Sequence, residues 1–212
     1  VTRLDTYVGE VLAKLKEKGF DKNTLVIFTS DNGPHMEGGA DPDFFGHNAI
    51  LRGTKRQTHE GGVRVPFIAW GPGMVPAGVV NDHQLAFYDV MPTFCELAGV
   101  EDYVAKYTNP KKEMDYFDGL SFAKTLTGKE GQQAHDFLYW EFEETDQVAV
   151  RMGDWKMVSK AGKPHLYNLS KDVHEDHDID EQHPDIVKKL VEIAHSQHTE
   201  SPYSKVTMPI ME

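Results

Sequence analysis

Residues 25–68 read LVIFTSDNGPHMEGGADPDFFGHNAILRGTKRQTHEGGVRVPFI. The first four, Leu25 to Phe28, are apolar and rich in β-branched side chains, and the run stops at the polar turn 30–34. Short apolar runs of this kind are typical of strands buried on both faces of a parallel sheet. In open α/β sheets, ligands bind beyond the carboxyl ends of the strands. The stretch therefore predicts an α/β fold with a binding site directly after this strand.

Two adjacent oxygen donors, Asp31 and Asn32, follow the predicted strand. The turn at Gly33-Pro34 is expected to leave both side chains directed into the crevice. A carboxylate beside an amide oxygen suits a hard divalent cation better than zinc, which prefers nitrogen and sulfur. The tripeptide DNG alone is also a common surface turn, so the metal site depends on the motifs that follow it.

A basic loop comes next, at residues 52–64, and Glu60 is its one acid. Glycines at positions 53, 61 and 62 are expected to let this loop approach a ligand closely. Oxygen donors for a metal, followed by a cationic loop, suggest an anionic substrate. The loop's cations are Arg52, Lys55, Arg56 and Arg64.

The composition excludes several classes of function. The length of 212 residues allows one large domain or two small ones, and 39% hydrophobic residues is ordinary for a globular protein. No window approaches the length of a transmembrane helix. The net charge of −12 argues against nucleic acid as a partner, and it means that an anion must be captured by local charge. The single cysteine, Cys95, excludes an internal disulfide and is expected to be a core residue.

The chain opens inside an amphipathic helical pattern. Residues 1–18 place an apolar stripe on one helical face, and Gly19 is expected to end the helix. A helix that has no strand before it suggests a piece whose N-terminus has been cut away. The stripe consists of Leu4, Val8, Val11, Leu12 and Leu15.

Further elements of the α/β part are expected before residue 136. Residues 36–50 are expected to form an irregular loop, and residues 65–70 a second buried strand. A short third strand is expected at 79–80, followed by a helix at 90–98 with Asp89 as its N-cap and Gly99 as its stop. Residues 101–135 are read as a connecting segment with one short helix near 121–126.

The remainder predicts a separate α+β subdomain. Short strands at 137–142, 147–152 and 155–158 lie so close together that only antiparallel pairing can join them. Residues 166–169 could add another strand, and a helix entered through Pro184 covers 186–194. The acidic segment 174–178 is expected to be a solvated turn rather than a metal cluster.

Four motifs in this order resemble the type I sulfatase family. They are SDNGPH at 30–35, LRGTKRQTHEGGVRVP at 51–66, DVMPTFCELAG at 89–99 and LYNLSKDVHED at 166–176. The last is similar to the family's LYDLxxDPxE, with Val173 in place of the proline. The resemblance implies the C-terminal part of an alkaline-phosphatase-like sulfatase fold, followed by a small α+β subdomain with an antiparallel sheet and a helix. The implied division is catalytic domain at 1–100, connecting segment at 101–135 and C-terminal subdomain at 136–212.

The same resemblance implies hydrolysis of sulfate esters in a sulfated small molecule or glycan. Calcium would be held by Asp31 and Asn32, and Lys55 would be the catalytic, sulfate-binding cation. His35 would contact the substrate at the rim of the cleft. The implied nucleophile is a formylglycine, which needs a Cys/Ser-x-Pro-x-Arg context found nowhere in these 212 residues, so this chain alone is expected to be inactive. A periplasmic, secreted or lysosome-like location is also implied.

Two other functions stay open at this point. A phosphate-transferring relative in the alkaline phosphatase superfamily would share the sheet and the anion loop, though not the LYDL-like segment together with the spacing from DNG to lysine. A non-catalytic binding module would keep only the cation site. Within the loop, Glu60 and Arg64 are expected to hold the loop in place. His59, where the family usually carries an aromatic residue, fits either substrate contact or loop packing.

Overall fold

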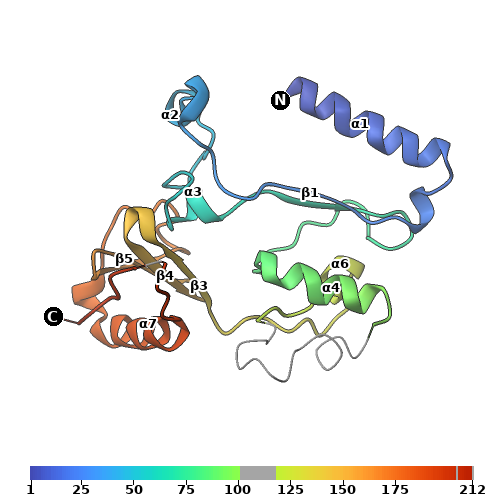
Figure 1. Ribbon diagram of the computed structural model, residues 1–212. Helices are drawn as coiled ribbons and strands as arrows, with labels where there is room; N and C mark the ends of the chain where they lie inside the picture. The colour runs from blue at the N-terminus through green and yellow to red at the C-terminus, as the bar shows by residue number, and fades with distance from the viewer. Residues whose placement is uncertain (101–117, 204, 212) are drawn as a thin grey trace. The chain divides into compact units, whose positions relative to one another are not determined.

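The structure is a computed structural model that describes residues 1–100, 118–203 and 205–211 (Figure 1). Contacts divide the chain into two compact units. Unit 1 comprises Val1–Phe28 and Phe67–His135, and unit 2 comprises Thr29–Pro66 and Asp136–Glu212. The domain boundaries implied by the sulfatase resemblance, at residues 100 and 135, remain a prediction.

Unit 1 contains the helices predicted before residue 136 and the first two predicted strands. Strands β1 and β2 are hydrogen-bonded neighbours in a two-stranded sheet. Both strands are only partly buried, and the side chain of Ile68 is 58% exposed. The expectation of burial on both faces is therefore wrong within the described residues, because two strands do not cover each other's faces. The elements are α1 (Thr2–Glu17), β1 (Val26–Thr29), β2 (Phe67–Trp70), α4 (Val90–Leu97) and α6 (Ala123–Thr127).

The first helix forms as the periodicity predicts, but its apolar stripe is not covered. Helix α1 is followed by Gly19 in the left-handed conformation (φ 73°), which fits the expected stop. None of its residues is buried among the described parts of the chain, and Leu4 and Val11 are more than half exposed.

Asp89 occupies the N-cap position of α4, as predicted, but its buried side chain makes no capping hydrogen bond to that helix. Its carboxylate accepts hydrogen bonds from the backbone N–H groups of Ala86 (2.7 Å) and Leu120 (2.8 Å), and it lies 2.8 Å from Nε2 of His135. The side chain thus joins the short 3₁₀ helix Phe87–Asp89 to segments that follow α4 in the chain.

Two smaller expectations for unit 1 differ from the structure. Residues 79–80 form no strand, and Val79 and Val80 are exposed. Cys95 is half-buried on α4 rather than in a core. The connecting segment is described only from residue 118, so its first part, 101–117, lies outside the described residues.

Unit 2 confirms the predicted antiparallel subdomain. Its four strands lie in the order β3-β4-β5-β6, and each neighbouring pair is antiparallel. The elements are β3 (Leu138–Phe142), β4 (Gln147–Met152), β5 (Trp155–Lys160), β6 (Lys163–Asn168) and the helix α7 (Pro184–Gln197).

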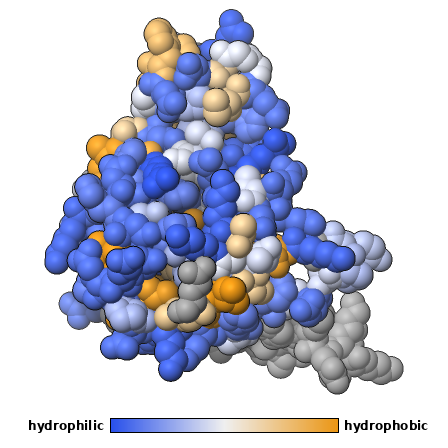
Figure 2. Space-filling view, turned by 90° about the vertical axis from the view of Figure 1, so that its left-hand side faces the viewer, coloured by the Kyte–Doolittle hydropathy of each residue, from blue (hydrophilic) through white to orange (hydrophobic). Residues whose placement is uncertain are grey.

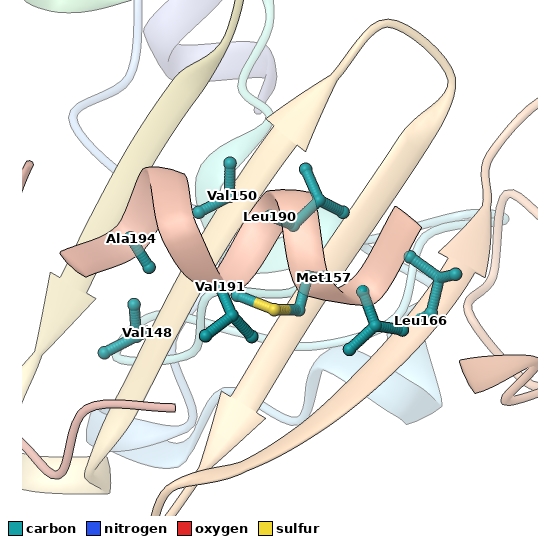
Figure 3. Close-up of a cluster of buried hydrophobic side chains, with 8 residues drawn as sticks. Val148, Val150, Met157, Leu166, Leu190, Val191 and Ala194 are labelled. Carbon is teal, nitrogen blue, oxygen red and sulfur yellow. The ribbon is translucent and has the colours of Figure 1, made fainter. Parts of the chain in front are cut away.

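The two faces of this sheet carry different side chains because successive residues point to opposite sides of a strand. Helix α7 covers one face, where apolar side chains from the helix and from β4, β5 and β6 meet (Figure 3). That core includes Val148, Val150, Met157, Leu166, Leu190, Val191 and Ala194. A smaller cluster, made of Ala149, Val158 and Tyr167 with Trp140 packed against it, lies apart from this core.

Residues 29–66 of unit 2 contain short helical segments, and two of these lie within residues 36–50, where the sequence predicted an irregular loop. Helix α2 (Pro42–Phe45) is started by Asp41, whose Oδ1 accepts from the N–H groups of Asp43 and Phe44 at 3.0 Å each. The 3₁₀ helix η2 (Glu37–Gly39) precedes it, and α3 (Glu60–Val63) ends the basic loop.

The molecular surface matches the polar composition. The face shown in Figure 2 is mainly hydrophilic, and its apolar side chains lie in separate patches. Among the described residues, no helix combines the length and the apolar character needed to cross a membrane.

Candidate functional site

The predicted metal ligands lie in the short turn that follows β1. Asp31 is exposed and Asn32 is half-buried. The turn is held by two hydrogen bonds: Ser30 Oγ donates to the carbonyl of Asn32 (3.0 Å), and Asn32 Nδ2 donates to the carbonyl of Gly33 (2.8 Å). Because the amide nitrogen of Asn32 is engaged, its Oδ1 is the atom left to act as a ligand.

Two backbone hydrogen bonds clasp this turn to the basic loop. The N–H of Gly33 donates to the carbonyl of Gly62, and the N–H of Lys55 donates to the carbonyl of Pro34, both at 2.9 Å. The contact at Gly33 is so close that an added Cβ would lie 1.8 Å from the carbonyl oxygen of Gly61. The structure therefore brings the segment of Asp31, Asn32 and His35 against the segment of Lys55.

Lys55 and His35 differ in how far their side chains are already engaged. Lys55 is half-buried, and its ammonium group forms no ion pair within the part of the chain that the structure describes. His35 Nδ1 accepts from the N–H of Glu37 (2.9 Å), and its Nε2 lies 3.5 Å from a carboxylate oxygen of the same residue. In the neutral ring this arrangement leaves the proton on Nε2.

The glycines of the basic loop serve the loop's own packing. A Cβ on Gly61 would lie 2.5 Å from the carbonyl oxygens of Arg52 and Gly53, and one on Gly62 would lie 2.0 Å from that of Gln57. Real Cβ atoms do not come so close to backbone oxygens. Glycine at positions 61 and 62 is therefore required by the packing of the loop itself, because the loop backbone fills the space that a Cβ would take. The close approach of a ligand to this loop stays a prediction.

The acid of the loop is structural, as the sequence predicted. Glu60 is 1% exposed, and its carboxylate pairs with Arg151 on β4 (2.8 Å) and Lys156 on β5 (2.9 Å). Burial alone would raise the pKa of Glu60, but the two neighbouring cations outweigh it and hold this pKa below its ordinary value.

A second buried acid, Glu175, was missed by the sequence analysis. The segment 174–178 was expected to be a solvated turn, yet Glu175 is fully buried. Its Oε2 accepts from the N–H of Glu60 at 2.8 Å. Burial raises the pKa of Glu175 to about 7, against the lowering effect of Lys156. Nothing in the local sequence pattern indicates that Glu175 is buried. The only sequence feature that could have drawn attention to it is its place at the end of the LYNLSKDVHE segment.

His59 packs in the loop rather than standing free in solvent. It precedes α3, and its ring centroid is 6.3 Å from that of Tyr167. Burial, together with the nearby charges of Arg52 and Lys156, lowers the pKa of His59 to about 4. The imidazole is therefore neutral at physiological pH, and this favours the loop-packing alternative.

The two oxygen donors after β1 are of the type that a hard cation binds, but they are too few to complete its coordination. A carboxylate from Asp31 and an amide oxygen from Asn32 are the ligand types that calcium takes. Calcium requires six to eight oxygen ligands, and the described residues contain no group of three or more His, Cys, Asp or Glu side chains placed to hold a metal. These two residues can therefore supply only part of a coordination shell.

Comparison with solved structures defines the class of protein. A Bacteroides thetaiotaomicron sulfatase reported in work on glycosaminoglycan metabolism matches with a TM-score of 0.71 and 28% identity, over 91% of this chain and 42% of that one. A sulfatase from Pseudoalteromonas sp. matches with a TM-score of 0.70 and 29% identity, over 92% of this chain and 40% of that one. The chain thus has part of the alkaline-phosphatase-like fold of sulfatases.

Sequence comparison names the family. The sulfatase family model matches residues 1–100. The N-acetylgalactosamine-6-O-sulfatase of Bacteroides thetaiotaomicron is 30% identical over 94% of this chain, and the N-acetylgalactosamine-6-sulfatase of Canis lupus familiaris is 42% identical over 74% of it. The chain belongs to the sulfatase family and corresponds to the C-terminal part of these proteins. It spans 41% and 27% of the two relatives' lengths.

Proposed function

We propose that this chain, as part of a longer protein that also contains the nucleophile, hydrolyses the sulfate ester of a carbohydrate. The observation that supports this is the clasp between the DNG turn and the basic loop, made by the Gly33–Gly62 and Lys55–Pro34 hydrogen bonds. The clasp holds oxygen donors for a cation on one segment and, on the adjacent segment, the ammonium group of Lys55, which has no ion-pair partner among the described residues. An anionic group that reaches this place is then flanked by positive charge.

Lys55 is the proposed electrostatic contact. A sulfate monoester carries one negative charge over three oxygens, and nucleophilic attack places more charge on them. A compact ammonium group stabilises that added charge better than a planar guanidinium in a tight site. The backbone of Lys55 is fixed by Pro34, so little reorganisation is needed when the substrate binds.

Asp31 and Asn32 are the proposed calcium ligands of this chain. When bound, calcium would polarise the sulfate oxygens. The other ligands, and the formylglycine nucleophile implied by the family resemblance, would come from outside these 212 residues. His35 is proposed to donate a hydrogen bond from Nε2 toward the substrate in place of its contact with the Glu37 carboxylate, since its Nδ1 accepts from the N–H of Glu37.

The relatives favour a sulfated sugar as the substrate class. Two are named for N-acetylgalactosamine 6-sulfate, and one similar structure, at 27% identity, was solved with a neocarrahexaose. A rat steryl-sulfatase is 37% identical over 66% of this chain, so a sterol sulfate is the competitor to test. A phosphonate monoester hydrolase also has this fold, but at 24% identity that likeness concerns the fold alone. A periplasmic, secreted or lysosome-like location is part of the proposal, and cell fractionation tests it.

The central test is Lys55→Ala in a form of the protein that carries the nucleophile. We expect kcat/KM for a 6-sulfated N-acetylgalactosamine substrate to fall about a hundredfold or more, the usual scale for one preorganised electrostatic contact. Lys188→Ala, at an exposed position on α7, is the matched control and should keep the parent value. Unchanged kcat/KM in the Lys55 variant would refute its role, and a preference for sterol sulfate or phosphate esters would refute the substrate class.

The metal ligands have a separate readout. Asp31→Ala in the same form should lower bound calcium, measured by elemental analysis, and should remove nearly all activity. Full calcium content in that variant would remove Asp31 from the proposed shell. The 212-residue chain alone should show no turnover of a sulfate ester above a buffer control.

A further inference from the structure

Both ends of the loop that carries Lys55 are bound to one residue, Glu175. At the start of the loop, Arg52 Nη1 donates to the carbonyl oxygen of Glu175 at 2.5 Å. At its end, the N–H of Glu60 donates to Glu175 Oε2 at 2.8 Å. The two ends are also joined directly, because the N–H of Gly61 donates to the carbonyl of Arg52 at 2.7 Å. Glu175 therefore closes the base of the loop 52–61.

Glu175 occupies its position under two unfavourable conditions. Its side chain is fully buried, and within the described residues Oε1 has no hydrogen-bond partner. Its backbone is left-handed, with φ of 59°, a conformation that favours glycine. Burial of a carboxyl group and a positive φ each cost free energy, so they persist only where the surroundings require the residue. The requirement visible here is the acceptor for the N–H of Glu60.

The sheet of unit 2 also binds the C-terminal end of the loop 52–61, at Thr58 and Glu60. Arg151 and Lys156 bind the carboxylate of Glu60, and Lys156 itself is fully buried with its ammonium 4.6 Å from the centre of the Trp140 ring. Thr58 donates from its N–H to Gln147 Oε1 at 3.0 Å. The residues that follow Lys55 are thus fixed on β4 and β5, and Glu175 connects this fixed end to Arg52.

We propose that Glu175 is a positioning residue: it closes the base of the loop 52–61 and so holds Lys55 against the DNG turn. The link to catalysis rests on the proposed function of Lys55, whereas the closure of the loop does not. The C-terminal subdomain would then contribute to the site through its LYNLSKDVHED segment without touching the substrate. Lys55 is three residues from Arg52 and five from Glu60, so loosening the base displaces it directly.

Amide hydrogen exchange tests the closure without any activity. In Glu175→Ala of the full-length protein, we expect exchange in the peptide 52–62, corrected for intrinsic rates, to rise roughly tenfold or more, because a buried donor loses its acceptor. Peptides from β4 and α7 should keep their parent rates. Glu175→Gln retains an acceptor for the N–H of Glu60 and should stay within about threefold of the parent.

Two further variants keep the test decisive. Asp176→Asn changes the neighbouring exposed acid and should leave exchange in 52–62 unchanged. Arg52→Ala removes the other tie to Glu175 at an exposed position, and it should reproduce part of the increase even where Glu175→Ala fails to fold. Parent-like exchange in 52–62 for both Glu175→Ala and Arg52→Ala would overturn the proposal. So would an equal rise in every peptide of unit 2, which indicates a purely structural role.

Measurements of kcat/KM then distinguish the positioning role of Glu175 from the proposed role of Lys55 in sulfate ester hydrolysis. If Lys55 acts on a sulfate ester, Glu175→Ala should lower kcat/KM at least tenfold in the parent, but by less than about threefold in a Lys55→Ala background, because coupled residues are not additive. Equal losses in both backgrounds would mean that Glu175 does not act through Lys55. If all forms are inactive while exchange in 52–62 rises as predicted, the proposed sulfatase activity is refuted and the proposed closure of the loop by Glu175 is supported.

Discussion

The two faces of the sheet in unit 2 are stabilised in different ways. On one face, α7 covers β4, β5 and β6 through a core of apolar side chains, among them Leu190 and Met157, which are fully buried (Figure 3). In contrast, Lys156 from the same sheet is buried in an ion pair with Glu60 of the basic loop. Glu175 adds a second buried carboxyl group beside that pair.

The difference shows how one sheet serves both folding and the site. Apolar burial is non-directional and tolerates small shifts, so it suits a helix whose role is to stabilise the sheet. Buried charges must meet partners in defined positions, because an unpaired one is costly. The face that carries the basic loop therefore defines loop geometry, and the face under α7 supplies stability.

The largest expected effect concerns the apolar face. Leu190→Ala should lower the free energy of unfolding of unit 2 by about 4 kcal/mol, since a fully buried leucine leaves a cavity when truncated. Denaturant unfolding followed by the fluorescence of Trp140 and Trp155 measures it. The loss should be the same at pH 5 and pH 8, because no titrating group is involved. A loss below about 1 kcal/mol would mean that α7 is not the stabilising cover.

The second largest expected loss of stability concerns the polar face, which carries the ion pair of Lys156 and Glu60. Lys156→Met should cost about 3 kcal/mol at pH 7, because Glu60 stays buried with only Arg151 as its partner. Lys160→Met, at an exposed position four residues along the same strand, is the matched control and should change stability by less than about 0.5 kcal/mol. Equal effects of the two substitutions would show that the buried pair does not stabilise the loop face.

Much of the fold was predictable from local pattern. Short segments separated by closely spaced turns predicted β3, β4 and β5, and the apolar period from Ile186 to Ala194 predicted α7, because each pattern matches the geometry of its element. The periodicity of a helix does not indicate which other element, if any, packs against its apolar face. The stripe of α1 has the same periodicity as that of α7, yet none of its residues is buried within the described chain.

The site was predictable where it depends on chain order and not where it depends on contacts across the chain. The DNG turn and the basic loop were identified because strand, turn and cations follow one another within residues 25–64. The roles of Glu175 and Lys156 were not identified, because a charged residue indicates solvent unless its partner is known. Their partner, Glu60, lies more than 90 residues earlier in the sequence.

The smallest expected effect concerns pH on the polar face. Burial raises the pKa of Glu175 from 4.5 to about 7, so between these values the folded chain binds a proton that the unfolded chain has released. Stability from this group is complete below pH 4.5 and is lost as the pH rises to about 7, by roughly 2 to 3 kcal/mol. His59 acts in the opposite direction. Its pKa is lowered from 6.5 to about 4, so its contribution to stability grows as the pH rises between these values.

Because the two windows overlap, the parent chain should show little net dependence on pH from these groups between about pH 4.5 and 6.5. Glu175→Gln removes one of the two opposing contributions. The difference in unfolding free energy, parent minus Glu175→Gln, should therefore fall by roughly 2 to 3 kcal/mol from pH 4.5 to pH 7, measured by denaturant titrations at intervals of half a pH unit. Groups common to both proteins cancel in this difference, and Leu190→Ala should give a flat difference over the same range. A flat difference for Glu175→Gln as well would mean that Glu175 is ionised throughout, held as Glu60 is by its neighbouring cations.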